Sequence, residues 1–385
     1  MASKSFDTII LGLGGMGSAA AFHLSKRGRR VLGIDQYTSA HSQGSSHGAS
    51  RIIRQAYYEN PAYVPLVQRA YELWVQLERD SGRDLLELTG GLMIGPPGSA
   101  VVEGTLASAI EHNLPYQTLD AQELKRRYPL FNPRPDDTAV YELRAGFLRP
   151  ELCVRAHLEQ AATHGADLHF EEVIEEWRAG SSGGVEVTTD RATYVAERLI
   201  VAPGAWAAAL LPGLQVQFDV RRHVMCWFDP PAGIEPFRPD NFPVYLWEVD
   251  PQDVFYGFPA TDGPAGGVKV AMHSGGDPCT ASSIKREISD GDVQELRTHL
   301  ASFIPPLNGP LLHAATCMYT LTPDEHFVVS LHPDHQQVAI AAGFSGHGFK
   351  FTSIVGEILA DLATTGRTRH DIALFSPDRF AVALR

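Results

Sequence analysis

Residues 8–35 read TIILGLGGMGSAAAFHLSKRGRRVLGID. The apolar run 8–11 predicts a buried parallel strand, and 31–34 predicts a second one. Between them, the small side chains of residues 18–26 predict a helix that packs closely on the sheet. Strand, helix and strand in this order predict a doubly wound α/β sheet, in which ligands bind beyond the carboxyl ends of the strands.

The turn between the first strand and the helix has the pattern GxGxxG. Gly12 suits the tight turn, Gly14 lets the backbone approach a pyrophosphate, and Gly17 lets the helix pack on the strand. The helix N-terminus offers unpaired N–H groups to the phosphates. Asp35 ends the second strand, where a carboxylate accepts both hydroxyls of an adenosine ribose. The motif predicts a bound dinucleotide and does not distinguish NAD from FAD.

A small, polar, glycine-rich segment, HSQGSSHGASRIIR, follows at residues 41–54. It predicts a loop that lies along a ligand, whereas a NAD-type fold would continue with another βα unit. Arg51 and Arg54 stand three residues apart in it and suggest contacts with anionic groups. A solvated basic loop is the alternative that the spacing leaves open.

The rest of the chain predicts two kinds of sheet. Residues 61–84 have the periodicity of a core-facing helix, and 216–319 alternate like strands of an antiparallel sheet. Lys269 and His273 stand four apart on one such strand and therefore on one face. The expected organisation is a discontinuous nucleotide-binding domain (1–85, 150–215 and 320–385) and a substrate domain (86–149 and 216–319).

Composition narrows the possible partners. The 385 residues include 32 Lys and Arg against 45 Asp and Glu, a net charge of −13, which disfavours nucleic acid and anionic membranes. The 4 cysteines form no CxxC pair, so we expect no metal centre or disulfide framework and a reducing, cytoplasmic location. No leader-like N-terminal segment and no long apolar run is present, so we expect no membrane association.

Two stretches near the C-terminus are more specific than the glycine turn. Residues 316–326 read TCMYTLTPDEH, and residues 342–351 read AGFSGHGFKF after an apolar strand. The second stretch predicts a strand, a glycine-rich loop and a helix that starts near Thr352, which gives a second site for a polar ligand. Two such sites in one chain point to a long cofactor such as FAD.

With these stretches the sequence resembles the monomeric sarcosine oxidase family, which includes N-methyltryptophan oxidases and belongs to the glycine-oxidase-like FAD amine oxidases. The matching segments are 12–17, 44–57, 199–206, 256–259, 316–326 and 342–351. The resemblance implies an α/β, two-domain architecture, with a Rossmann-like FAD-binding domain and an antiparallel-sheet substrate domain. It departs at Gln55 and Ser46, where close relatives often carry histidine.

The resemblance also implies site residues. Cys317 would be joined covalently to FAD, Arg54 and Lys350 would bind a substrate carboxylate, and Lys269 would activate O₂. Arg51 and His47 would lie around the flavin as catalytic groups. The remaining pocket residues would be Tyr256, His273, Tyr319, Ile52 and Gly346, and the remaining cofactor contacts would be Ser45, Val173, Gly343 and Gly348.

The expected activity is oxidation of a secondary, N-methyl amino acid such as sarcosine by a monomer. The product imine would hydrolyse to formaldehyde and a primary amino acid, and O₂ would be reduced to H₂O₂. Glycine, N-methyltryptophan, pipecolate, proline or an N-carboxymethyl amino acid are alternative substrates. A flavin dehydrogenase with another electron acceptor, or a non-catalytic nucleotide-binding protein of the same fold, are alternative functions.

Overall fold

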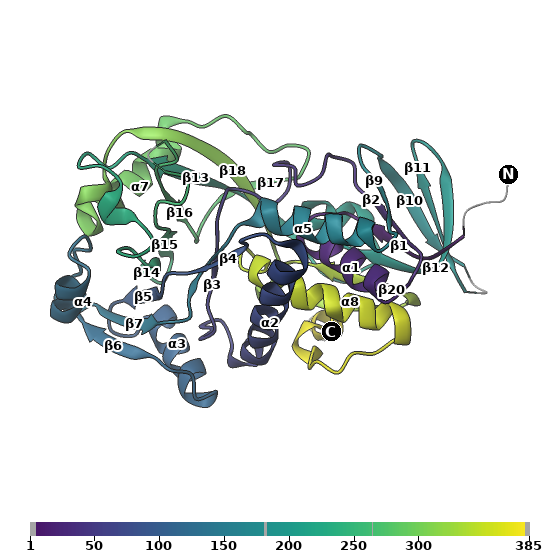
Figure 1. Ribbon diagram of the computed structural model, residues 1–385, viewed down its shortest axis with the longest axis horizontal. Coiled ribbons are helices and arrows are strands. Elements are labelled where there is room, and N and C mark those ends of the chain that lie inside the picture. Colours follow the sequence, from purple (N-terminus) through teal and green to yellow (C-terminus); the bar gives the residue numbers. More distant parts are fainter. Residues whose placement is uncertain (1–4, 181–182, 264, 382–385) are drawn as a thin grey trace.

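The computed structural model describes residues 5–180, 183–263 and 265–381. Two large sheets lie toward opposite ends of its longest axis, with the small sheet and α2 (Val64–Ser81) between them (Figure 1). The small sheet has the order β3-β8-β4, formed by β3 (Arg51–Ile53), β8 (Gly146–Leu148) and β4 (Leu86–Leu88). The mixed α/β class predicted from the sequence is confirmed.

The first large sheet is eight-stranded, and its centre is parallel. β1 pairs in parallel with β2 and with β12, β2 with β9, and β12 with β20. The hairpins β10–β11 and β19–β20 complete it. Its strands are β1 (Phe6–Leu11), β2 (Val31–Ile34), β9 (Asp167–His169), β10 (Ile174–Ala179), β11 (Val185–Thr189), β12 (Thr193–Val201), β19 (Val328–His332) and β20 (His335–Ala342).

Helices pack against one face of this parallel centre. α1 (Gly15–Lys26) contacts both α5 (Pro150–Thr163) and α8 (Thr352–Thr365), as Figure 1 also shows. α1 and α8 approach each other closely, because a Cβ on Gly356 of α8 would collide with Ala19 of α1. Ala19 is one of the small residues expected in the first helix. The first strand, helix and second strand predicted from the sequence are confirmed within a few residues at each end.

The second large sheet is nine-stranded and antiparallel except where β14 pairs in parallel with β5. β18 runs beside β13 over most of their lengths. Three helices belong to this part: α3 (Ala100–Glu111), α4 (Ala121–Arg127) and α7 (Asp290–Phe303). The strands are β5 (Gly91–Gly95), β6 (Gln117–Asp120), β7 (Thr138–Glu142), β13 (Asp219–Phe228), β14 (Val244–Asp250), β15 (Asp253–Gly257), β16 (Val268–Met272), β17 (Asp277–Cys279) and β18 (Leu311–Leu321).

Some local predictions need correction. The helix expected over 61–84 begins with a 3₁₀ turn at Pro61–Tyr63 and ends at Ser81, where Gly82 adopts φ +67°. The end of the loop expected at 41–54 is strand β3, because Arg51–Ile53 pair with β8. The remaining short helices are α6 (Ala207–Leu210) and α9 (Asp378–Ala381). No helix in the described ranges is long and apolar enough to cross a membrane.

Candidate active site

A long cavity of about 280 Å³ opens beyond the carboxyl ends of the parallel strands. The glycine turn, Asp35 and Ile174 line one end of it, and Cys317 and Tyr319 line the other. Between them it is bordered by Ser45 and by three predicted glycines, Gly343, Gly346 and Gly348. One cavity is therefore lined by both glycine-rich segments, as expected for a ligand with a nucleotide at one end and a second polar group at the other.

The glycine turn has the geometry that a pyrophosphate requires. Gly12 adopts φ +88°, and a Cβ there would collide with the Ala202 carbonyl oxygen. A Cβ on Gly17 would collide with the Gly12 carbonyl, so the predicted close packing of α1 on this turn is confirmed. At Gly14 the nearest atom to a Cβ would be Ser46 Oγ at 3.9 Å, so the turn leaves space beside the start of α1.

Asp35 is fixed at the nucleotide end of the cavity. Its carboxylate accepts hydrogen bonds from the Leu13 N–H at 2.7 Å and the Tyr37 N–H at 2.9 Å. Burial raises the pKa of Asp35, and the two backbone donors oppose that shift. A buried carboxylate beside the glycine turn suits the ribose of adenosine and disfavours a 2′-phosphate.

Cys317 lies at the far end of the same cavity, beside a guanidinium. The Arg51 Nη2 donates to Cys317 Sγ at 3.4 Å and to the Ser45 carbonyl at 3.0 Å. Burial acts to lower the pKa of Arg51, but nearby Cys317 and tyrosines outweigh burial, so the pKa lies above its usual value. The Arg51 guanidinium therefore stays cationic. The sulfur of Cys317 is therefore in direct contact with a cationic side chain at this end of the cavity.

A second cavity of about 60 Å³ joins the first one. Arg51, Tyr319, Gly346 and Phe349 line both cavities, so the two spaces meet at these residues. The other predicted pocket residues in its wall are Ile52, Arg54, Tyr256, His273 and Lys350. The sequence-based set of substrate residues is therefore brought together in one small chamber beside the Cys317 end of the long cavity.

Arg54 is the first of two buried cations in this chamber. It is 3% exposed and packs over the rings of Tyr57 and Tyr58 at 4.4 and 4.7 Å. Its Nη2 contacts the Glu59 carboxylate at 2.6 Å. Burial disfavours the Glu59 charge, but Arg54, His347 and Lys350 prevail and lower the pKa of Glu59 to about 2. The Glu59 carboxylate therefore already uses one of the hydrogen-bond donors of Arg54.

Lys350 is the second cation and is 5% exposed. Its Nζ donates to the His347 carbonyl at 2.7 Å and to Tyr57 Oη at 3.4 Å, which uses two of the three donors of an ammonium. Burial and then the charge of Arg54 lower the pKa of Lys350 to about 7. The Lys350 ammonium thus titrates near neutral pH, and an additional anion beside it stabilises its charged form.

Aromatic and imidazole rings form the opposite wall. Tyr256 Oη and Tyr319 Oη are 3.4 Å apart, and the His223 ring stacks on Tyr319 with centroids 3.9 Å apart. Gly346 is required here, because a Cβ on it would collide with the Tyr319 ring. Burial, the largest effect, lowers the pKa of His273 to about 4, so its imidazole is neutral at pH 7.

Other predicted residues lie outside the walls of both cavities. Lys269 is 2% exposed, and its Nζ donates to the Gly48 and Ser50 carbonyls at 2.7 and 2.6 Å, directly beneath the loop that carries Arg51. β16 ends at Met272, so His273 lies just beyond the strand. His273 lines the second cavity, whereas Lys269 lines neither cavity.

His47 and Val173 were also predicted to contact the flavin or adenine. His47 is buried, its Nε2 has no hydrogen-bond partner within the described residues, and burial lowers its pKa to about 3. Val173 donates its N–H to Asp190 Oδ1 at 2.9 Å, and its neighbour Ile174 lines the cofactor cavity. The roles of both residues stay predictions.

Sequence reasoning missed several carboxylates that shape the site. Glu59 pairs with Arg54, as above. Glu151 accepts the Gly48 and Ala49 N–H groups at 2.6 and 3.2 Å and so fixes a loop in which Ala49 adopts φ +65°. Glu142 accepts the Gln55 and Ala56 N–H groups at 2.7 and 2.9 Å. An acid five residues after Arg54 was a visible signal for Glu59, whereas Glu142 and Glu151 are distant in sequence.

The fold and the lined cavity define a flavin-dependent oxidoreductase, and the chain belongs to that family: the profile described as DAO, FAD dependent oxidoreductase, matches residues 7–362. Within the family it belongs with the monomeric sarcosine and N-methyltryptophan oxidases. It is 52% identical to a monomeric sarcosine oxidase of Streptomyces avermitilis, over 99% of each chain. It is 34% identical to an N-methyl-L-tryptophan oxidase of Yersinia pestis, over 97% of this chain and 99% of that one.

A solved structure has the same architecture. NikD, an unusual amino acid oxidase essential for nikkomycin biosynthesis, superposes in its open form with a TM-score of 0.84 at 25% identity, over 97% of this chain and 98% of that chain. The family resemblance and the FAD cofactor inferred from the sequence are therefore confirmed, and the protein is an FAD-dependent amine oxidase of this group.

Proposed function

We propose that the protein oxidises a small N-methyl amino acid such as sarcosine, with O₂ as the electron acceptor. The observation that carries this proposal is the pair of buried cations, Arg54 and Lys350, in a chamber of about 60 Å³ that adjoins the Cys317 end of the cofactor cavity. A zwitterion with a short carbon skeleton fits such a chamber, and an indole-bearing substrate would need the wall to move.

The cofactor cavity suits FAD in each of its parts. The open turn at Gly14 would face the pyrophosphate, Asp35 the ribose, and the Cys317–Arg51 pair the isoalloxazine. We infer that Cys317 carries the flavin covalently as a thioether, because Cys317 lines the cavity and its sulfur contacts the Arg51 guanidinium. FAD, when bound, supplies the two-electron acceptor.

Substrate binding begins with the carboxylate. The Arg54 guanidinium donates hydrogen bonds to the Ala56 carbonyl and to Glu59. A substrate carboxylate competes with Glu59 for this guanidinium. An ammonium has three N–H donors, and Lys350 uses two of them within the chain. The third is free to donate a hydrogen bond to the substrate carboxylate. Anchoring this end fixes the N-methyl carbon relative to the cofactor, which converts a diffusive encounter into an oriented one.

The amine must react as the free base, since a protonated nitrogen has no lone pair to assist loss of hydride. Two groups of the chamber wall are neutral, because the pKa of His273 is about 4 and that of Tyr319 lies well above 10. The cations Arg51, Arg54 and Lys350 in the same wall disfavour an ammonium. Loss of two electrons and two protons from the CH₃–NH unit gives an imine, and the same electrons and protons convert O₂ to H₂O₂. Water then splits the imine into formaldehyde and the primary amine.

We assign the reaction with O₂ to the buried cations beneath the cofactor. Lys269 binds the Gly48 and Ser50 carbonyls of the segment that leads into Arg51, and Arg51 contacts Cys317; a fixed positive charge stabilises developing superoxide. Burial, followed by the charge of Arg51, lowers the pKa of Lys269 well below its usual value. His47 adds a neutral imidazole beside this pair.

We also propose the organisation and setting of the molecule. The FAD-binding domain comprises 1–85, 150–215 and 320–385, and the substrate domain comprises 86–149 and 216–319, a division supported by the two large sheets. A monomer in the cytoplasm is supported by the names of the relatives, the net charge of −13 and the free cysteines.

A peroxide-release screen tests the activity. The purified yellow protein is mixed with sarcosine, other N-methyl amino acids, proline, pipecolate, glycine and N-methyltryptophan, and H₂O₂ is followed with a coupled peroxidase. We expect sarcosine or another small N-methyl amino acid to have the highest kcat/KM. A preference for glycine or for N-methyltryptophan would overturn the proposed substrate class, and flavin reduction without peroxide would indicate a dehydrogenase.

A further inference from the structure

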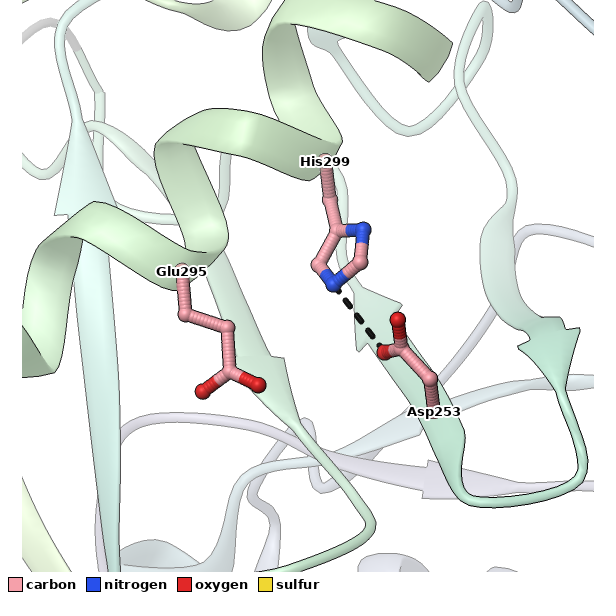
Figure 2. Close-up of side chains that lie close together, drawn as sticks. All are labelled: Asp253, Glu295 and His299. Atoms are coloured by element: carbon pink, nitrogen blue, oxygen red, sulfur yellow. Dashed lines mark ion pairs between the residues drawn. The ribbon is translucent and has the colours of Figure 1, made fainter.

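Three side chains with metal-binding atoms converge on the substrate domain, away from both cavities. His299 and Glu295 project one turn apart from α7, and Asp253 faces them from the start of β15 (Figure 2). Their ligand atoms lie within 4.8 Å of one another. In the described ranges this is the one group of three or more His, Cys, Asp or Glu side chains with such geometry.

Two of these atoms lack the hydrogen-bond partner that buried polar atoms normally have. His299 Nε2 and Asp253 Oδ1 form an ion pair at 3.0 Å (Figure 2), but neither atom has a hydrogen-bond partner among the described residues. His299 is 7% exposed. Its ring stacks on Phe255 with centroids 5.1 Å apart and an interplanar angle of 4°, which fixes the direction in which Nε2 points. Buried polar atoms without a hydrogen-bond partner call for an explanation.

A shared cation supplies the missing partner. Zinc bonds of about 2.0–2.2 Å at tetrahedral angles place neighbouring ligand atoms about 3.3 Å apart. The Asp253–His299 distance of 3.0 Å needs only a small opening to reach that value, and the exposed Glu295 can approach by rotating its side chain. We propose that Asp253, Glu295 and His299 bind one divalent transition-metal ion, represented by Zn²⁺, with water in the fourth position.

The donor set decides between metals. One imidazole nitrogen and two carboxylates suit Zn²⁺ and its neighbours in the transition series. Ca²⁺ takes six to eight oxygen ligands and Mg²⁺ prefers oxygen and water, so neither matches a site with a buried imidazole.

The position of the site defines what the metal does. Successive residues of a strand face opposite sides of the sheet, so Asp253 and Phe255 face α7 while Tyr256 faces the substrate chamber. The metal therefore joins α7 to the back of the strand that carries Tyr256, and it does not reach the reacting atoms. Its expected effect is on the stability of the substrate domain rather than on the chemical step.

The test is zinc binding by the purified, tag-free flavoprotein after treatment with a chelator. ZnCl₂ is titrated in the presence of a chromophoric zinc chelator, and thermal unfolding is followed with and without the metal. We expect one equivalent to bind and to raise the unfolding temperature. His299→Gln and Asp253→Asn, which keep side-chain size, are expected to weaken binding at least tenfold and to abolish the thermal shift, and Glu295→Gln is expected to weaken binding less.

Two matched variants serve as controls. Glu235→Gln makes the same carboxylate-to-amide change at an exposed site. His335→Gln makes the same imidazole-to-amide change at a pair of neighbouring histidines, His332 and His335, whose ring centroids lie 4.8 Å apart. Both are expected to bind zinc like the wild type. Unchanged binding in Asp253→Asn and His299→Gln, loss of binding in His335→Gln instead, or no binding by the wild type would overturn the proposal. A folded variant is verified by its flavin spectrum, so a failure to fold is distinguished from a loss of metal.

Discussion

The pKa of Lys350, lowered to about 7 by burial and by Arg54, predicts a pH-dependent affinity for carboxylates. A lowered lysine pKa means that the free site is fully cationic below pH 7 and loses that charge as the pH rises. A carboxylate binds to the charged form, so its affinity is full at low pH. It should fall about tenfold per pH unit above 7, and about a hundredfold between pH 6 and 9.

Around the chamber, the other described groups with shifted pKa values titrate outside that window. The pKa values of Glu59, His347 and His273 are about 2, 3 and 4. Burial raises that of Tyr57 well above 10, and Arg54 remains charged. Removing one charge about 4 Å from a carboxylate costs about 4 kcal/mol at an effective dielectric constant of 20, or about three decades of affinity. The decline therefore continues throughout the range.

Acetate is the appropriate probe, because it has no amine and its own carboxyl is ionised from pH 6 to 9. Its binding is followed by the change in flavin absorbance at each pH. Lys350→Met is expected to bind acetate weakly at every pH, and Lys350→Arg is expected to bind it without the decline. A flat profile in the wild type, or the same decline in Lys350→Met, would refute the assignment of the titrating cation to Lys350.

Three further outcomes are expected from the same site. Glu59→Gln removes the carboxylate that competes for Arg54, so acetate affinity should rise about tenfold while the free energy of unfolding falls by roughly 3 kcal/mol; unchanged acetate binding in the folded variant would contradict the competition. Cys317→Ser should release its flavin on acid precipitation, whereas the matched Cys226→Ser should retain it; retention in Cys317→Ser would exclude the thioether. Lys269→Met should slow reoxidation by O₂ at least a hundredfold more than reduction by substrate, as measured by stopped flow, and equal losses in both steps would sink its proposed role.

Local patterns were sufficient for the elements that hold the nucleotide. The roles of Gly12 and Gly17 follow from backbone sterics within a few residues, and the structure reproduces them. The convergence of Arg54, Lys350, Tyr256 and His273 came from the family resemblance, because no periodicity relates residues so far apart. Asp35 was predictable for the same reason as the glycines, since it ends the second strand of one βαβ unit.

What sequence reasoning could not supply depends on tertiary packing. The Glu59–Arg54 contact depends on the conformation of a loop that Glu142 holds from β7. The spacing of Glu295 and His299 is visible as one helical turn, but only the pairing of sheet and helix brings Asp253 beside them. The sequence placed Lys269 on a strand, but it could not show that the Gly48 and Ser50 carbonyls hold its ammonium.

The stoichiometry of sarcosine oxidation, measured in one reaction, tests the central proposal most directly. Substrate consumed, O₂ consumed, H₂O₂, formaldehyde and glycine are measured in one reaction. Equal amounts of all five are expected if the N-methyl carbon is the site of oxidation. Glyoxylate and methylamine in place of formaldehyde and glycine, or oxidation without H₂O₂, would contradict it.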